Sequence, residues 1–399
     1  MTEKRYSAQF QRGIIVKTEE RRKVMNDLQK RSWAEIFTDN IRHNYRAIRS
    51  HLPEGCRFLG VVKADAYGHG ALRVSQILEE EGADYLAVSC LDEALELRQG
   101  GIRIPILILG HTPREYVRVL IENDITQTVT CLAKAVEFSE EAVRLGKTLR
   151  THIKVDTGMS RLGFLCAGEY FDEGVSNIVK AVSLPGLETE GIFTHFSVSD
   201  EEGNENRAYT LSQFDLFTSV IGAVEEAGDV RFAIRHCANS GAVVNYPETA
   251  LDMVRPGLLL YGYGDTTGRL GLRPCMRLVT TISTIKYYGS GTDVSYGRHY
   301  TTDKLTRMGV LAIGYADGLP RASSGKCSYA VKGGHAQQCG SICMDMCMAD
   351  LTGLNEADVG SEVEIFGENN SIYSISDAAG TIPYELLCAV SKRVPRVYK

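Results

Sequence analysis

The chain has 399 residues, of which 44% are hydrophobic, a formal net charge of −6 and 11 cysteines. This length exceeds the usual limit of a single core, so we expect two domains or one large barrel with an addition. The mild negative charge argues against a nucleic-acid-binding surface, and no apolar stretch approaches the roughly 20 residues that cross a bilayer. The N-terminus lacks the apolar centre of a signal peptide. We therefore expect a cytoplasmic protein whose cysteines are mostly free thiols.

Residues 1–30 are polar and charged, and we treat them as an N-terminal extension of unassigned role. Within it, residues 18–31 are typical of one exposed helix. The segment that follows predicts a short strand and then an amphipathic helix, with Ile41, Tyr45 and Ile48 on one stripe.

From residue 58 onward, short apolar segments alternate with amphipathic helical stretches. The apolar segments occupy residues 58–62, 84–89, 104–109, 125–130, 149–155, 187–196, 231–236 and 251–255. Near-continuous apolar strands separated by helices predict a parallel sheet. Eight such strands favour a closed (β/α)8 barrel over residues 31–272, with an open doubly wound sheet as the alternative.

The pattern changes after residue 272. Segments 277–288, 306–318 and 361–368 are rich in β-branched residues with glycines at the turns, and a helical pattern returns only at 376–390. We predict a second, mainly β domain over residues 273–399.

In a (β/α)8 barrel the chemistry gathers at the carboxyl ends of the strands. The predicted ends carry cations, an imidazole and small hydrogen-bonding residues: Lys63, Lys154, Asp156, Arg161, His195, Asn239, Ser240, Arg255 and Gly257. The loops after the seventh and eighth strands, which hold Asn239-Ser240 and Arg255-Pro256-Gly257, lie where such barrels often bind phosphate, although each alone is also typical of an ordinary turn.

A phosphate site together with a strand-end lysine indicates pyridoxal 5′-phosphate, whose aldehyde requires one well-placed amine. Lys63 is the expected attachment point, because burial favours the neutral amine that this step needs. Arg255 is a candidate partner of the pyridine nitrogen. A cation there keeps that nitrogen unprotonated and limits side reactions at the carbanion.

Nine motifs in order carry a family resemblance: VVKADAYGHG, HIKVDTGMSRLGF, GIFTHFSVSD, HCANSGA, VRPGLLLYG, SYGRHY, GYADGLPR, SICMDM and TIPYE. From about Trp33 to the C-terminus the chain resembles the alanine racemases, which are fold-type III pyridoxal-phosphate enzymes. The resemblance implies interconversion of L- and D-alanine, supply of D-alanine for peptidoglycan, and a homodimer with shared active sites.

The resemblance also implies two catalytic bases, one on each face of the cofactor. Lys63 matches the base that removes the α-proton of the D-isomer. Tyr296 matches the base for the L-isomer, supplied by the partner subunit. An ordinary tyrosine titrates near pH 10, so Tyr296 would need a neighbouring cation to ionise usefully, and His195 and Arg161 match the positions that supply this positive field and pack by the cofactor.

The remaining site residues follow from the same resemblance. Tyr67, Ser240, Gly257 and Tyr384 match phosphate-holding positions, with Asn239 beside them. Arg161 and the backbone of Met344 match positions that receive the substrate carboxylate, Asp345 and Tyr315 match the entrance across the dimer interface, and Lys154 matches a lysine that is carbamylated in some members and braces the arginine seven residues later.

Alternative interpretations remain at this stage. A serine or broad-specificity racemase is expected to depart from tyrosine at the TIPYE position, which Tyr384 retains. A pyridoxal-phosphate carrier would lack the second domain, and the SYG and CMDM motifs argue against a decarboxylase. His335, Cys339, Cys343 and Cys347 recur at four-residue intervals, but this is not a usual zinc spacing and the segment 340–350 is typical of a strand, so we expect core thiols and no metal site.

Overall fold

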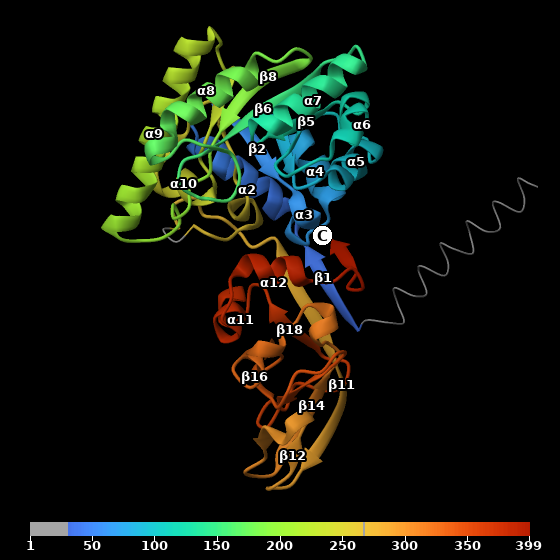
Figure 1. Ribbon diagram of the computed structural model, residues 1–399. Helices are drawn as coiled ribbons and strands as arrows, with labels where there is room; N and C mark the ends of the chain where they lie inside the picture. The colour runs from blue at the N-terminus through green and yellow to red at the C-terminus, as the bar shows by residue number, and fades with distance from the viewer. Residues whose placement is uncertain (1–30, 266–267) are drawn as a thin grey trace, which may run out of the picture. The chain divides into compact units, whose positions relative to one another are not determined.

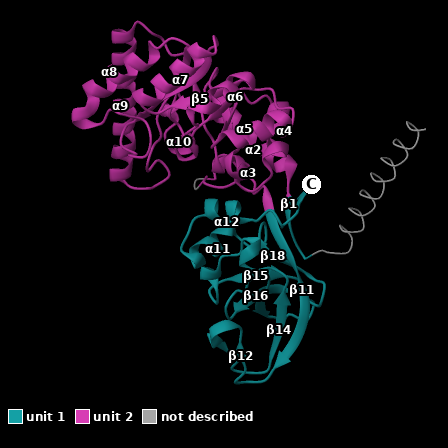
Figure 2. Ribbon diagram, turned by 45° about the vertical axis from the view of Figure 1, so that its right-hand side comes forward, with its two compact units in different colours: residues 1–35, 277–397 teal, residues 36–276, 398–399 magenta. Residues whose placement is uncertain are grey.

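The computed structural model describes residues 31–265 and 268–399, so the helix expected at 18–31 lies outside the described residues except for Arg31. Contacts divide the chain into two compact units (Figure 2). One unit, the barrel unit, spans Ile36–Met276 and takes in residues 398–399. The other, the C-terminal unit, spans Arg277–Val397 together with the described residues up to Glu35. The contacts thus group residues 31–35 with the C-terminal unit, whereas the sequence-based boundaries assigned them to the barrel segment.

The barrel unit is a (β/α)8 barrel of parallel strands (Figure 1). The strands in spatial order are β10 (Met253–Val254), β2 (Arg57–Val61), β3 (Tyr85–Val88), β4 (Ile106–Ile108), β5 (Ile125–Val129), β6 (Leu149–Asp156), β8 (Leu187–Phe193) and β9 (Ile234–His236). The ends of this sheet meet where the Asp252 amide donates to the Arg235 carbonyl at 3.0 Å and the Arg255 amide donates to the Ala238 carbonyl at 2.9 Å. The predicted barrel, rather than the open sheet, is confirmed.

Helices lie around the strands. They are α2 (Thr38–His51), α4 (Ala71–Glu81), α5 (Leu91–Gln99), α6 (Val117–Glu122), α7 (Leu132–Arg144), α8 (Phe171–Val182), α9 (Asn204–Gly228) and α10 (Ser240–Asn245). The predicted stripe of α2 is confirmed, since Ile41, Tyr45 and Ile48 are all buried. Among the described residues, no helix is long and apolar enough to cross a membrane.

Strand β6 shows how a barrel interior can hold polar side chains. Alternation places His152 and Lys154 on one face and Ile153 and Val155 on the other. The His152 imidazole lies in the space that a side chain on Gly191 would fill, because a Cβ there would come 2.5 Å from the ring. The pairing of β6 with β8 shifts register at this point, between Thr151 and His152, so that Glu190 is an extra residue of β8.

The C-terminal unit is mainly β, as predicted. Its principal strands are β11 (Met276–Tyr288), β14 (Thr306–Leu311), β15 (Ser328–Val331), β16 (Gly334–Cys339), β17 (Cys347–Asp350) and β18 (Glu362–Phe366). Because β11 pairs with both β14 and β18, these strands form a closed antiparallel ring. Strands β1 (Ser32–Ile36) and β19 (Arg396–Tyr398) extend the sheet beyond β11, and β12 (Asp293–Val294) pairs with β13 (Tyr300–Thr301).

Two local expectations differ from the structure. The helical pattern at 376–390 is two helices, α11 (Ile372–Ala379) and α12 (Pro383–Ala389), because Gly380 ends the first in a left-handed conformation and Pro383 begins the second. The segment 340–350 is a strand only from Cys347, and residues 340–346 form a loop. Cys339 and Cys347 are buried, as expected of core thiols, whereas Cys343 is partly exposed.

Candidate active site

The end of β2 turns into an unusual segment, α3 (Lys63–Tyr67). Ala64, Asp65, Ala66 and Tyr67 have φ values of 53°, 54°, 52° and 51°, so the chain makes a left-handed turn directly after Lys63. Such a conformation costs about 1–2 kcal/mol for each non-glycine residue. The strained turn therefore holds Lys63 at the strand end and places the hydroxyl of the buried Tyr67 beside Gly257.

Tyr67, Ser240 and Gly257 converge although they come from the end of α3, the start of α10 and the turn after β10. The Ser240 hydroxyl accepts from the Gly257 amide at 2.8 Å. A Cβ added to Gly257 would lie 2.7 Å from the Tyr67 hydroxyl and 3.8 Å from the Ser240 Oγ. Gly257 has φ −104° and ψ −90°, outside the regions that most L residues adopt. A glycine here therefore suits the backbone, and it also lets the Tyr67 hydroxyl approach closely.

Asn239 lies beside this group, but its side chain is already engaged. Its Oδ1 accepts from the Ala242 amide at 3.0 Å, as the N-cap of α10, and from the Ser199 hydroxyl at 2.6 Å. Asn239 therefore fixes the start of α10, where Ser240 lies.

Basic side chains gather around His195 at the carboxyl ends of β2, β6 and β10. Burial, together with the charges of Arg255, Lys154, Arg161 and Lys63, holds the pKa of His195 well below its ordinary value. The imidazole is thus neutral at physiological pH. Since each of these cations acts on one ring, the structure brings together the basic residues predicted on the barrel rim.

Arg255 is buried and hydrogen-bonded on several sides. Its guanidinium donates to the Thr194 carbonyl at 2.7 Å, to the Cys237 carbonyl at 3.0 Å and to Nδ1 of His195 at 3.3 Å. Burial lowers the pKa of Arg255 to about 10, so it stays a cation at neutral pH. Because arginine only donates, Nδ1 of His195 must accept and the proton of its neutral ring must lie on Nε2.

A directional hydrogen-bond chain runs from Arg255 through the barrel interior. Arg255 donates to Nδ1 of His236 at 2.9 Å, so the Nε2 proton of His236 points to Nδ1 of His152, also 2.9 Å away. Nε2 of His152 then donates to Glu190 at 3.2 Å, and the Tyr85 hydroxyl donates to the same carboxylate at 3.0 Å. Sequence reasoning missed this chain, although histidines inside the buried strands β6 and β9 were a signal.

Lys154 lies on the same face of β6 as His152 and is buried. Its amine is 4.6 Å from the centre of the Phe193 ring. Burial and the charges of Arg255 and Arg161 hold its pKa well below the ordinary lysine value. The amine is therefore biased toward its neutral form.

The loop that carries the exposed Arg161 is shaped by Asp156. Its carboxylate accepts from the Gly158 and Ser160 amides, both at 3.0 Å. The loop then returns so closely to β6 that a Cβ on Gly163, whose φ is +127°, would lie 2.7 Å from the Asp156 amide nitrogen. The MSRLG segment thus folds back on its own strand end and presents Arg161 at the rim.

The other predicted site residues belong to the C-terminal unit. Tyr296 is 70% exposed and lies in a short 3₁₀ turn beside a cleft of about 520 Å³. Met344 and Tyr315 are also exposed, and the Tyr315 and Ala316 amides donate to the carbonyls of Cys343 and Met344, both at 3.0 Å. The structure thus brings the Met344 and Tyr315 loops together.

Asp317 anchors these two loops. It is fully buried and accepts from Arg31 at 2.6 and 2.9 Å, from Arg393 at 2.7 Å and from the Gly314 amide at 2.9 Å. Arg393 also pairs with Asp345 at 2.9 Å, and Arg31 donates to the Asp345 carbonyl. Although burial opposes it, these arginine contacts lower the pKa of Asp317. The sequence pattern did not indicate this cluster, in which Arg31 bonds to residues 286 and 314 positions away.

Tyr384 lies in α12 and is half-buried. Like Tyr296, Met344, Asp345 and Tyr315, it belongs to a different compact unit from Lys63. The barrel unit alone therefore assembles Lys63, Tyr67, Lys154, Arg161, His195, Asn239, Ser240, Arg255 and Gly257.

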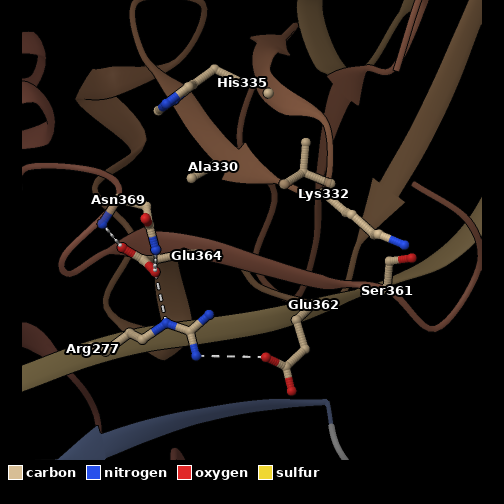
Figure 3. Close-up of a pocket in the computed structure, with 10 residues that line it drawn as sticks. Arg277, Ala330, Lys332, His335, Ser361, Glu362, Glu364 and Asn369 are labelled. Atoms are coloured by element: carbon tan, nitrogen blue, oxygen red, sulfur yellow. Dashed lines mark hydrogen bonds and ion pairs between the residues drawn. The ribbon is translucent and has the colours of Figure 1, made fainter. Parts of the chain in front are cut away.

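The C-terminal unit has a further cleft of about 530 Å³ (Figure 3). Arg277 bonds there to the buried Glu364 at 2.7 Å and pairs with Glu362 at 3.6 Å, while Asn369 donates to Glu364. No residue predicted for the active site lines this cleft, and its buried carboxylate is already satisfied.

Comparisons with known proteins show the family to which the chain belongs. The alanine racemase N-terminal domain family matches residues 36–265, and the alanine racemase C-terminal domain family matches residues 275–398. An alanine racemase of Clostridium perfringens (strain SM101 / Type A) is 44% identical over 375 residues, which cover 92% of this chain and 95% of that protein.

Solved structures give the same result. An alanine racemase of Clostridium difficile 630 is similar with a TM-score of 0.87 at 41% identity, covering 93% of this chain and 96% of that one. The alanine racemase from Bacillus anthracis, described with bound L-Ala-P, has a TM-score of 0.83 at 33% identity and covers 93% of this chain and 96% of that one.

Proposed function

Because the chain belongs to the alanine racemase family and is therefore an amino-acid racemase, we propose that it interconverts L- and D-alanine with pyridoxal 5′-phosphate and two bases, Lys63 and Tyr296. The observation that carries this proposal is the convergence of Lys63, the cations around His195, and the space left by Gly257 at one end of the barrel.

The residues present fit pyridoxal phosphate. The Tyr67 hydroxyl, the Ser240 hydroxyl and the Gly257 backbone lie together, and a side chain on Gly257 would push the Tyr67 hydroxyl away, so this group of donors suits a phosphate. Lys63 supplies the amine, and we propose that Tyr384 adds a further hydroxyl. When bound, the cofactor withdraws electrons from the α-carbon of the amino acid and so acidifies its α-proton.

Inversion at the α-carbon requires a base on each face. In the proposal Lys63 takes and returns the proton of D-alanine, and Tyr296 takes and returns that of L-alanine. The strained turn after Lys63 restricts where its amine can lie, and the exposed Tyr296 is available to a partner subunit.

Arg255 keeps its proton at neutral pH and faces His195 and His236 as their donor. A guanidinium in this place would hold the pyridine nitrogen unprotonated, which limits side reactions. The chain from Arg255 to Glu190 fixes the orientation of the guanidinium and the tautomers of both barrel histidines.

We propose that Arg161 and the backbone of Met344 receive the substrate carboxylate, since the arginine is exposed on a loop that Asp156 shapes. Lys154 supports Arg161. Its lowered pKa supplies the neutral amine that carbamylation requires, and a ¹³C NMR carbamate signal from protein equilibrated with ¹³C-bicarbonate at neutral pH would reveal that modification.

A homodimer with shared sites is part of the proposal. Tyr296, Met344, Met346 and Tyr315 are 70%, 53%, 47% and 43% exposed, and such a concentration of large apolar side chains is typical of an interface. Mixing Tyr296→Phe and Lys63→Ala subunits should restore activity, because hybrid dimers contain one intact site. No recovery would count against shared sites.

The direct test is D-isomer formation from L-alanine, and separately from L-serine, by purified protein with added pyridoxal phosphate. We expect fast turnover of alanine and slow turnover of serine. Comparable serine turnover would indicate a broad-specificity racemase, and no turnover of either would overturn the proposal. Supply of D-alanine for peptidoglycan and a cytoplasmic location complete the proposed role.

A further inference from the structure

We infer that Glu93, on α5, is a positioning residue for Lys63, because its carboxylate holds the first amide of the left-handed turn that follows the lysine. Its Oε1 accepts from the Ala64 amide at 2.7 Å, and its Oε2 accepts from the Ser89 amide at 2.7 Å. Glu93 therefore links the carboxyl ends of two neighbouring strands, β2 and β3. The inference rests on the proposed function of Lys63.

A simpler interpretation is that Glu93 only caps its own helix. It is the third residue of α5, and an acid in the first turn commonly accepts an amide from just before the helix. The bond to Ser89, the residue before the N-cap Cys90, is compatible with that role. The bond of the second oxygen is not, because it reaches a residue 29 positions away, which no helix cap requires.

The left-handed turn explains why the Ala64 amide needs an external acceptor. The first amides of a helical turn have no carbonyl partner within it, and Ala64 is the first of four consecutive residues with positive φ. Strain of this kind persists only where surrounding contacts hold it.

The turn is held at both ends by carboxylates. Glu93 accepts from Ala64 at its beginning, and the side chain of Asp65 accepts from the Ala71 amide at 2.8 Å beyond its end. The two bonds differ in what they position. Ala64 is the residue next to Lys63, so releasing its amide frees the backbone that sets where the lysine stem starts. A long, flexible lysine keeps its amine in place only if its backbone is fixed.

The test compares Glu93→Gln with Glu96→Gln. Glutamine keeps the size of the side chain but loses one acceptor, and its NH₂ group then faces an amide donor. Glu96 lies on the same helix with an exposed side chain, which makes it a matched control. Three quantities are measured on the full chain: the dissociation constant of pyridoxal phosphate, the fraction of cofactor that borohydride traps on Lys63, located by peptide mass, and the thermal unfolding of the cofactor-free protein.

We expect Glu93→Gln to raise the dissociation constant by about tenfold, the order expected for loss of a hydrogen bond to a charged group, and to lower trapping on Lys63. Glu96→Gln should change neither. If Glu93→Gln lowers only the unfolding temperature, with cofactor affinity and trapping unchanged, Glu93 is a helix cap and the inference is overturned.

If Glu93→Gln does not fold, Glu93→Asp takes its place, because it keeps the charge but is one methylene shorter. It should raise the dissociation constant by a smaller factor, and wild-type affinity in this variant would overturn the inference. If the wild-type chain itself takes up no cofactor at Lys63, both this inference and the proposed function fail, which distinguishes that result from a failure of Glu93 alone.

Discussion

Replacing Asp317 by asparagine should destabilise the C-terminal unit strongly. Asp317 is fully buried and accepts four hydrogen bonds, two on each oxygen, from Arg31, Arg393 and the Gly314 amide. Asparagine retains one acceptor oxygen, so two of these bonds become contacts between donors. Breaking a buried ion pair costs about 3–5 kcal/mol. Because Arg31 and Arg393 are 38% and 41% exposed and can regain water, we expect the lower end, about 3 kcal/mol.

Urea unfolding followed by tryptophan fluorescence suits this test, since Trp33 is the single tryptophan of the chain and is buried in β1 of the same unit. The matched control is Asp345→Asn, which removes a half-exposed partner of the same arginines and should cost less than about 1 kcal/mol. If both substitutions lower the free energy of unfolding equally, or if Asp317→Asn lowers it by less than about 1 kcal/mol, Asp317 does not anchor the C-terminal unit.

The same comparison has a pH dependence. The pKa of Asp317 is lowered in the folded protein, so the folded state binds its proton less readily than the unfolded state. The contribution of ionised Asp317 to stability is complete above the unfolded-state pKa of about 3.9, and it is lost as the pH falls through the folded-state pKa. The difference in the free energy of unfolding between wild type and Asp317→Asn should be constant from pH 8 to 5 and shrink below about pH 4. A gap that persists unchanged to pH 3 would contradict this assignment.

Three further predictions concern the barrel. Gly257→Ala should weaken binding of pyridoxal phosphate by at least about tenfold, because the new Cβ would crowd the Tyr67 hydroxyl. The control is Gly222→Ala in the middle of α9, where a Cβ would have nothing within 4 Å. It should leave binding unchanged and slightly stabilise the helix. Equal affinities of both variants by titration would refute the cradle. His236→Leu should lower the free energy of unfolding by about 2–3 kcal/mol in urea, because Arg255 loses an acceptor inside the barrel, and a loss within error would contradict the chain. Iodoacetamide at pH 8 should label Cys90 and Cys131, which are exposed, and spare Cys237, whose pKa burial raises to about 12, as read by peptide mass.

The barrel was predictable because its strands are buried on both faces and so read as apolar runs between amphipathic helices. The rim residues followed, since parallel strands bring all their carboxyl ends to the same side. Lys63, Lys154, His195 and Arg255 therefore could be grouped before any contact was known.

Contacts that depend on atomic positions could not be predicted. The left-handed turn at Ala64–Tyr67 contains no glycine, so its residue types gave no indication of positive φ values. In the sequence, Glu93 is typical of an acidic residue in the first turn of a helix. Its bond partner Ala64 lies 29 positions away. The cluster around Asp317 joins residues even further apart.

One missed feature did have a signal. Gly380 and Pro383 separate α11 from α12 by the usual chemistry of helix ends, and the single helical pattern at 376–390 overlooked both. The strand expected at 340–350 is short for a related reason, because Gly340, with a φ of +69°, ends the preceding strand and opens the loop that carries Met344.

The central claim is that Lys63 and Tyr296 act on opposite faces of the substrate. The most direct measurement is α-proton exchange in D₂O by the Tyr296→Phe variant with added pyridoxal phosphate, followed separately for D-alanine and L-alanine by NMR. We expect D-alanine to exchange its α-proton without inversion, since Lys63 remains, while L-alanine keeps its proton. Equal exchange of the two isomers, or racemisation at the wild-type rate, would contradict this claim.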